Sequence, residues 1–219
     1  MREAIEKMAR KIDLVVDEEK LGKLVRYAEE LLRWNKAYNL VGRKIGTEGL
    51  IDLCMDAISL LSVRGLLSER TEVLDIGSGA GLPGIPLYIM AGPFPLTMVE
   101  SQRKKITFLR HVCRTVSLDE ARVYPGRLEE MAREEDNICS YDVAMARAVM
   151  DPLRLLKLAW PLICEGGRTV LFVGKNDAER LRKAGPSLGE RGMKLEVIRS
   201  AQRIIGKEHF LVVARKSSA

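Results

Sequence analysis

The sequence has few residues of the kinds that hold metal ions or form disulfides, and it has no long hydrophobic run. None of its four cysteines belongs to a Cys-x-x-Cys pair, and with only two histidines no cluster with metal-ligand spacing is visible. All four lie in apolar sequence, which predicts buried free thiols in a reducing compartment: Cys54, Cys113, Cys139 and Cys164. No apolar run is long enough to span a bilayer, and residues 1–7 are charged rather than forming the apolar core of a signal peptide. We therefore expect a cytoplasmic protein that binds no metal and contacts no membrane.

The length and the charge of the chain limit its fold and its partners only broadly. With 219 residues, 47% of them hydrophobic, the chain is long enough for one α/β domain and a small additional lobe. Its 36 Lys and Arg against 30 Asp and Glu give a net charge of +6. By itself this mildly basic balance predicts nonspecific attraction to polyanions, and the charged surface of an ordinary enzyme explains it equally well.

The most informative stretch is a glycine-rich loop that follows the short apolar run 73–76. That run contains Asp75, and the loop after it holds four glycines and two prolines: Gly77, Gly79, Gly81, Pro83, Gly84 and Pro86. Glycine tolerates positive φ and has no Cβ, so such a loop can turn tightly and let a ligand approach its backbone. Proline suits the first turn of a helix. The pattern predicts a strand, a glycine loop and a helix, with a ligand over the loop at the carboxyl end of the strand.

The chain changes character near residue 70, which divides it into two expected domains. Residues 1–67 have apolar residues at helical spacing and predict a small helical lobe. In residues 68–219 short strands alternate with helices, which predicts an α/β domain with a mostly parallel sheet. We expect strands at 72–76, 96–100, 121–124, 141–146, 168–173, 194–199 and 209–214, and helices at 84–91, 102–116, 127–134, 152–163 and 177–190. The last two strands lack a helix between them and should be antiparallel.

Two acidic residues favour one nucleotide-like ligand over another. Gly79, Gly81 and Gly84 match the dinucleotide fingerprint, but such a match is weak by itself. Asp75 would repel a pyrophosphate, whereas it can engage the cationic ammonium of a methionine group or order the loop that does so. Glu100, at the end of the next strand, can accept hydrogen bonds from both ribose hydroxyls. Together they favour S-adenosylmethionine over NAD, with an ordinary capping role as the alternative for Asp75.

These motifs resemble those of the bacterial 16S rRNA guanine-N7 methyltransferases once called glucose-inhibited division protein B. The matching blocks run in order from about residue 30 to the end of the chain: 34–40, 75–87, 100–109, 126–130, 146–148 and 209–213. The resemblance implies a seven-stranded Rossmann-like class I methyltransferase sheet with a closing antiparallel strand and a small helical N-terminal lobe. It further implies S-adenosyl-L-methionine as methyl donor, 16S rRNA of the 30S subunit as partner, and N7 of one guanine in the 530 loop as the methylated atom.

The resemblance also implies the cofactor site. Five residues match the S-adenosylmethionine contacts of the family: Gly77, Leu82, Leu128, Glu129 and Arg147. Glu100 is the expected ribose acceptor. Three more residues of the glycine block complete the expected site: Asp75, Gly79 and Gly81. The chain departs from the family at two positions. Leu53 stands where a His is usual, and Glu208 stands where an Arg commonly precedes the last His.

Methylation at guanine N7 needs alignment but no general base, because N7 has an in-plane lone pair and no proton to lose. Motifs for other methylations are missing. No Asx-Pro-Pro-aromatic motif, as used in methylation of exocyclic amines, follows the fourth strand. Carbon-5 methylation needs a Cys nucleophile at the end of a strand, whereas Cys164 is expected at the end of a helix. Our candidates for catalysis are Arg147, between the donor carboxylate and the nucleotide, and Lys175, on an RNA phosphate. The alternative is that Arg147 and Lys175 are solvated cations on loops without a catalytic role. Asp52 and Asp56 share one helix face and are expected to be structural.

A basic stretch at 101–114 is the expected RNA contact, because it holds five Lys and Arg and no acid. The candidate contacts are Arg103, Lys104, Lys105, Arg110 and, near the lobe, Lys36, with Arg203 and Lys207 extending the surface. A solvated helix face is the usual role of such a run and is the alternative. We expect the chain to act as a monomer.

Three other functions compete with rRNA methylation. An S-adenosylmethionine-dependent methyltransferase could act on another RNA, a protein or a small molecule, which would make the basic stretch incidental. Asp75 disfavours an NAD-dependent oxidoreductase. A pure RNA-binding module would leave the glycine loop unexplained.

Overall fold

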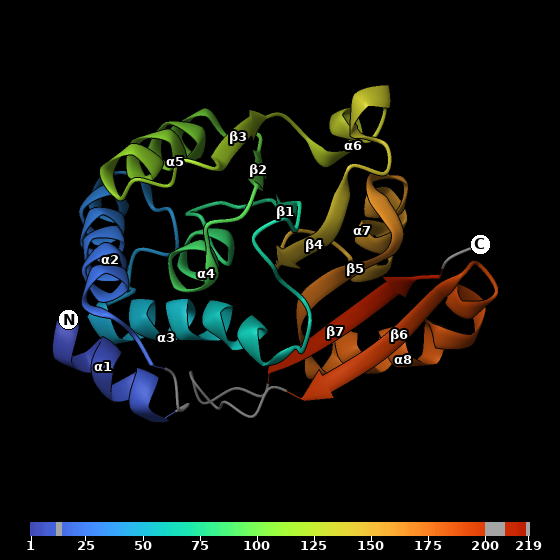
Figure 1. The fold of residues 1–219 in the computed structure, drawn as a ribbon, viewed down its shortest axis with the longest axis horizontal. Helices are drawn as coiled ribbons and strands as arrows, with labels where there is room; N and C mark the ends of the chain where they lie inside the picture. Colours follow the sequence, from blue (N-terminus) through green and yellow to red (C-terminus); the bar gives the residue numbers. More distant parts are fainter. Residues whose placement is uncertain (12–14, 200–208, 218–219) are drawn as a thin grey trace.

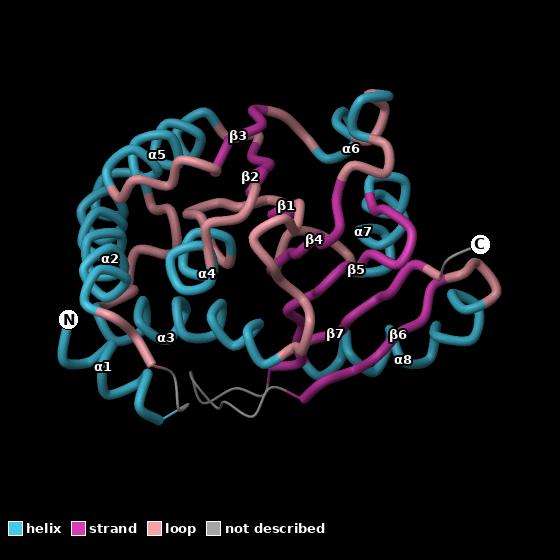
Figure 2. Tube along the Cα trace, viewed as in Figure 1, coloured by secondary structure: helices cyan, strands magenta, loops and turns pink. Residues whose placement is uncertain are grey.

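The computed structural model describes residues 1–11, 15–199 and 209–217. A seven-stranded sheet crosses the molecule with helices on both of its faces (Figure 1), and the strands form one continuous band (Figure 2). The strands are β1 (Val73–Ile76), β2 (Leu96–Glu100), β3 (Ala121–Pro125), β4 (Tyr141–Arg147), β5 (Ile163–Gly174), β6 (Met193–Arg199) and β7 (His209–Lys216).

The strand order is β3-β2-β1-β4-β5-β7-β6. Strands β1 to β5 run parallel to one another, whereas β7 is antiparallel to both β5 and β6. The chain order reverses at β1, which has β2 on one side and β4 on the other. Ligands of open α/β sheets bind outside the carboxyl ends of the strands at such a switch point. The predicted α/β class, the seven strands and the closing antiparallel pair are confirmed.

The helices fall into two groups, one on each face of the sheet. They are α1 (Arg2–Lys11), α2 (Glu18–Tyr38), α3 (Thr47–Ile58), α4 (Gly84–Ala91), α5 (Arg103–Thr115), α6 (Leu128–Met131), α7 (Pro152–Ala159) and α8 (Lys175–Gly189), with 3-10 turns η1 (Ser59–Ser62), η2 (Glu135–Asn137) and η3 (Trp160–Leu162). Figure 1 shows α1, α2 and α3 (blue to cyan) grouped away from α8 (orange). None of the helices in the described residues has the length and apolar character that a membrane crossing requires.

Alternate strand residues build two separate cores, as the period of two in a strand requires. Val143 and Met145 of β4 face a core shared with α2, α3, α4 and α5. Ala144 and Ala146 face the other core, shared with α6, α7 and α8. The helices of residues 1–67 therefore pack on the sheet directly rather than forming a core of their own.

The structure corrects two expectations about cysteines. Cys54 and Cys113 are buried, but Cys139 is exposed in the turn before β4, where φ is +51°. Cys164 lies in β5 and is half-buried, not at the end of a helix. The reason is Pro161, which cannot continue an α-helix, so α7 ends at Ala159 and the short turn η3 leads into β5 at Ile163.

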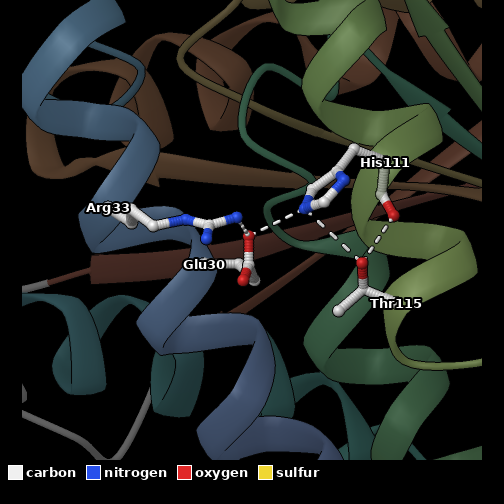
Figure 3. A network of polar contacts seen from close by, with 4 residues as sticks. All are labelled: Glu30, Arg33, His111 and Thr115. Carbon is white, nitrogen blue, oxygen red and sulfur yellow. Dashed lines mark hydrogen bonds and ion pairs between the residues drawn. The ribbon is translucent and has the colours of Figure 1, made fainter.

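A polar network joins α2 to α5 (Figure 3). Glu30 Oε2 lies 2.7 Å from His111 Nε2 and 2.6 Å from Arg33 Nη2, and the Thr115 hydroxyl donates to the His111 carbonyl at 2.9 Å. Burial alone would raise the pKa of the Glu30 carboxyl, but the hydrogen bond to His111 and the charge of Arg33 lower it below its usual value. This network, with the ring of Trp34 5.2 Å from that of His111, holds α5 against the lobe.

A buried hydrogen bond joins the lobe to the glycine loop. The Tyr27 hydroxyl on α2 donates to the Ala80 carbonyl at 2.9 Å, and the Tyr27 side chain is fully buried. A buried carbonyl without this donor would be left without a partner for its lone pair.

We predict that Tyr27→Phe lowers the free energy of unfolding by about 1–2 kcal/mol, the cost of a buried carbonyl that loses its donor. Urea unfolding followed by circular dichroism measures it. Tyr38→Phe is the matched control, because Tyr38 is 45% exposed, and it should change stability little. Equal stability of the two variants would show that the Tyr27 bond does not brace the loop.

Candidate functional site

A cavity of about 390 Å³ opens at the carboxyl edge of the sheet, beside the switch point. This volume lies within the range of small-molecule sites. The segments that follow β1, β2, β3 and β4 all contribute to its lining: Ile76, Gly77, Val99, Glu100, Ser101, Gln102, Lys105, Gly126, Arg127, Leu128, Glu129, Ala148, Val149 and Met150. The parallel arrangement brings these four strand ends, which are far apart in the sequence, to one place.

Gly77 lines this cavity, and no other residue type fits its position. Its φ is +66°, a conformation that L side chains rarely adopt. A Cβ on Gly77 would also lie 2.7 Å from Val149 Cγ2, well inside van der Waals contact. The loops after β1 and β4 therefore pack together only because Gly77 has no side chain.

Glu100 lines the cavity at the end of β2. Its side chain accepts the backbone N–H of Gly79 at Oε2 (2.9 Å) and that of Gln102 at Oε1 (2.8 Å). Each carboxylate oxygen keeps a second lone pair, so the group can still accept hydrogen bonds from a ligand. One carboxylate thus connects the glycine loop to the start of α5 and faces the cavity.

Asp75 lies behind the loop rather than in the cavity lining. It is fully buried on β1, and its Oδ2 accepts the Gly84 backbone N–H at 3.2 Å. Burial raises the pKa of the Asp75 carboxyl to about 7, although the Ser78 hydroxyl and the Gly84 N–H act to lower it. Of the two roles expected for Asp75, this geometry supports ordering of the loop and does not present the carboxylate to a ligand.

The other glycine-block residues also support the loop from behind. Leu82 is buried in the core below the loop. Gly81 has φ +87° and abuts Ile85, so the turn into α4 is as tight as predicted from the glycines and prolines. Gly81 and Leu82 do not line the cavity. Gly79 does not line it either, but its N–H donates to Glu100.

Leu128 and Glu129 form the far wall, at the first residues of α6. Leu128 is buried with its side chain in the second core, and both residues line the cavity. Glu129 Oε1 lies 3.0 Å from Arg154 Nη2 on α7, which orients the carboxylate. The structure therefore brings Gly77, Glu100, Leu128 and Glu129 together around one cavity.

Arg147 ends β4 next to the cavity but does not line it. Its Nη1 lies 2.6 Å from Asp56 Oδ2 on α3, where the Asp56 side chain is almost fully buried and that of Arg147 is 16% exposed. The guanidinium also lies over the Phe172 ring, 5.9 Å from its centroid. Ala148, with φ +50°, then turns the chain so that residues 148–150 line the cavity. Asp56 thus has the structural role that we expected, as the partner of Arg147.

The remaining predicted residues lie outside the cavity, with one exception. Lys175 begins α8 directly after β5 and is exposed at the same edge of the sheet. Arg103, Lys104 and Arg110 are exposed on α5, whereas Lys105 is half-buried and lines the cavity. Lys36 is exposed in the last turn of α2. Arg203, Lys207 and Glu208 lie outside the described residues.

Sequence reasoning missed several lining residues because they carry no chemical signature. Ser101, Gln102, Gly126, Arg127 and residues 148–150 line the cavity through their position just after a strand. That position is itself a usable signal, since ligands bind at the carboxyl ends of parallel strands. Their side-chain types alone would not have identified them.

The arrangement fits a ligand with an adenosine group. Apolar side chains of Ile76, Val99, Leu128 and Val149 line the cavity, and Glu100 provides acceptors for hydroxyls. Across the residues that the structure describes, no three His, Cys, Asp or Glu side chains gather closely enough to hold a metal ion.

Comparison with known proteins identifies a family whose members the chain resembles over most of its length. Residues 20–209 match the family model described as rRNA small subunit methyltransferase G. Proteins named Ribosomal RNA small subunit methyltransferase G are similar to the chain: that of Carboxydothermus hydrogenoformans is 34% identical, with 93% of this chain and 86% of the relative covered. That of Syntrophotalea carbinolica is 29% identical over 99% and 98% of the two chains.

Solved structures agree with the fold. A putative O-methyltransferase from Klebsiella pneumoniae superposes with a TM-score of 0.63 at 13% identity, covering 88% of this chain and 90% of that one. A SAM-dependent methyltransferase from Aquifex aeolicus gives 0.59 at 16% identity, with 86% and 98% covered. At this identity the likeness shows the shared architecture alone.

We predict that Asp75→Asn changes how stability depends on pH. An acid whose pKa is about 7 in the folded protein and about 3.8 when unfolded binds its proton more tightly when folded, so stability falls as pH rises from about 4 to about 7. Asn keeps an acceptor for the Gly84 N–H but cannot ionise, so the variant should lose this contribution.

Chemical denaturation at pH 5 and pH 8 measures the effect. The gap in unfolding free energy between the two pH values should be smaller in Asp75→Asn than in the wild type. The exposed Glu130→Gln is the control and should follow the wild type. An identical gap in all three proteins would show that Asp75 is ionised in the folded state throughout this range.

Proposed function

Because the chain belongs to the rRNA small subunit methyltransferase G family, we propose that it transfers a methyl group from S-adenosyl-L-methionine to N7 of one guanine in the 530 loop of 16S rRNA. The observation that carries this is the family match over residues 20–209, on a fold that places a cavity at the sheet switch point. The family identified from the motifs is confirmed by this match.

The lining residues suggest how the methyl donor is held. In our proposal Glu100 accepts the ribose hydroxyls, because its carboxylate faces the cavity with lone pairs to spare. Leu128 and Val99 enclose the adenine, and the Gly77 backbone lies beside the methionine part. When bound, S-adenosyl-L-methionine supplies an electrophilic methyl group on a sulfonium. Asp75 supports this site by holding the glycine loop in its turn.

The protein's task in the reaction is alignment. Guanine N7 attacks with its own lone pair, so catalysis rests on positioning the base rather than on proton transfer. Arg147 suits this role because Asp56 fixes its guanidinium at the end of β4, one residue before the cavity lining begins. In our proposal Arg147 bridges the carboxylate of the donor and the target nucleotide, while Lys175 contacts an RNA phosphate.

The rRNA approaches, in our proposal, across α5 and the end of α2. Lys105 lines the cavity and its neighbour Lys104 lies over the Tyr38 ring, 5.6 Å from the centroid, so these cations continue from the cavity to the surface. Arg103, Arg110 and Lys36 extend the positive surface. We place the enzyme in the cytoplasm, because its substrate is ribosomal RNA, and propose that it acts on the 30S subunit as a monomer.

The test of the function is incubation of the protein with 30S subunits and methyl-labelled S-adenosyl-L-methionine. Borohydride and aniline treatment then cleaves RNA at 7-methylguanosine, so primer extension locates the modified nucleotide. We expect one new stop in the 530 loop. Label in the RNA without cleavage there would contradict the atom or the site, and label in protein alone would contradict the substrate class.

We predict that Arg147→Ala lowers kcat/KM roughly 10²-fold, the loss expected when the reacting groups are no longer held in alignment. It should also destabilise the fold by about 3–5 kcal/mol, since it removes the cation that faces the buried Asp56 carboxylate.

A double variant separates these two effects. Asp56→Leu with Arg147→Met removes both buried charges and should recover most of the stability, because replacing a buried ion pair by apolar residues is often neutral. Its methyl transfer should stay low. Near wild-type turnover in the double variant would remove Arg147 from the mechanism.

A further inference from the structure

A second cavity, of about 470 Å³, lies on the other side of the molecule from the candidate site, where β5, β6 and β7 pass the loop that follows η1. Four cations line it: Arg64, Arg168, Lys194 and Arg215. It is near the amino end of the parallel part of β5, six residues before Gly174 at the carboxyl edge. At about 3.3 Å per residue this separates it from that edge by roughly 20 Å.

The strand register places three of these cations in one row. Lys194 of β6 is directly opposite Arg215 of β7, and Arg215 is directly opposite Arg168 of β5. Directly opposite residues project from the same face of a sheet, with Cβ atoms roughly 5 Å apart. Like charges in this relation destabilise a sheet, so the row costs the fold free energy.

The positive charge of the row is not neutralised within the described residues, where none of the four cations has a carboxylate within 4.0 Å. Arg168 donates from Nη1 to the carbonyls of Arg64 (3.3 Å) and Gly65 (3.1 Å), which fixes its position but leaves its charge unpaired. Glu196 lines the same cavity without pairing with any of them.

Protection of the sheet edge explains only part of this row. Cations on an edge strand prevent pairing with other chains, and β6 is the edge strand, which accounts for Lys194. Arg215 and Arg168 lie on β7 and β5, each of which has a neighbour on both sides, so edge protection does not apply to them. A ligand with several negative charges would account for all four cations together.

We propose that the groove of Arg64, Arg168, Lys194 and Arg215 binds the phosphate backbone of the RNA substrate at a second point, remote from methyl transfer. This inference rests on the proposed function for the class of substrate. Two strand spacings make the row roughly 10 Å long, enough for more than one backbone phosphate. The lining has no aromatic side chain on which a base could stack, so the groove reads the backbone and not the sequence.

The position of the groove has a consequence for substrate choice. An RNA that occupies both the groove and the cavity must span the sheet, so a large folded rRNA should bind more tightly than a short oligonucleotide around the target guanine. We therefore expect the cations on the face of β5, β7 and β6 to favour a large RNA over a short one.

The test reverses charge in the groove with Lys194→Glu/Arg215→Glu, both exposed residues. The control is Arg182→Glu/Lys183→Glu, which makes the same charge change at exposed positions on α8 that line neither cavity. Filter binding measures the Kd for a 16S rRNA fragment that includes the 530 loop and its neighbouring helices, at several salt concentrations. A short oligonucleotide of the target loop is the second probe.

We expect the groove variant to bind the long RNA at least tenfold more weakly than the control does, with a flatter salt dependence, since each lost phosphate contact removes roughly 0.7–0.9 from the slope. Its KM for the long RNA should rise while kcat and the KM for the oligonucleotide stay unchanged. Its melting temperature should stay near that of the control, because positions 194 and 215 remain alike in charge while position 215 gains an opposite charge at Arg168.

Two results would count against these proposals. If the groove variant is folded but binds the long RNA as the control does, the row is a structural feature and the inference is wrong. If the wild type methylates no RNA, the proposed function fails, whereas a selective loss of RNA binding in the groove variant would still support the groove.

Discussion

The glycine loop after β1 is the constraint on which the site depends, and a buried hydrogen bond from the Gly84 N–H to Asp75 holds it in place. The loop can turn this tightly because Gly77 has φ +66° and leaves room for Val149. Glu100 then receives the Gly79 N–H from the same loop. The cavity wall is thus a set of backbone groups whose positions are fixed from behind by buried carboxylates and from the lobe by Tyr27.

The N-terminal helices α2 and α3 hold residues of the sheet region in place near the cavity. Asp56, on α3, holds Arg147 at the end of β4, and α2 holds α5 through the Glu30 network. Because Arg147 and Lys105 belong to the region where donor and RNA are expected to meet, the lobe sets the geometry of that region. A displacement of α3 would move the Arg147 guanidinium through its contact with Asp56, without any substitution in the sheet.

Positive charge has two arrangements in this protein. On α5, exposed cations alternate with buried apolar residues, so the charges lie apart on a helix face and cost little. On β5, β7 and β6, three cations are aligned by register on neighbouring strands, where repulsion is strongest. The first arrangement is common on protein surfaces. The second is maintained against an energetic penalty, which is why we assign it a ligand.

The sequence by itself determined the fold class, the site loop and the family, because these depend on local patterns: strand–helix alternation, glycine spacing, and acids that end β1 and β2. It also predicted α4 at its observed bounds, Gly84–Ala91. Only the tertiary structure decided that Asp75 supports the loop from behind, that Asp56 pairs with Arg147, and that Lys194, Arg215 and Arg168 form one row. These relations join residues far apart in the chain, and their distances come from strand register and helix packing, which no local pattern encodes.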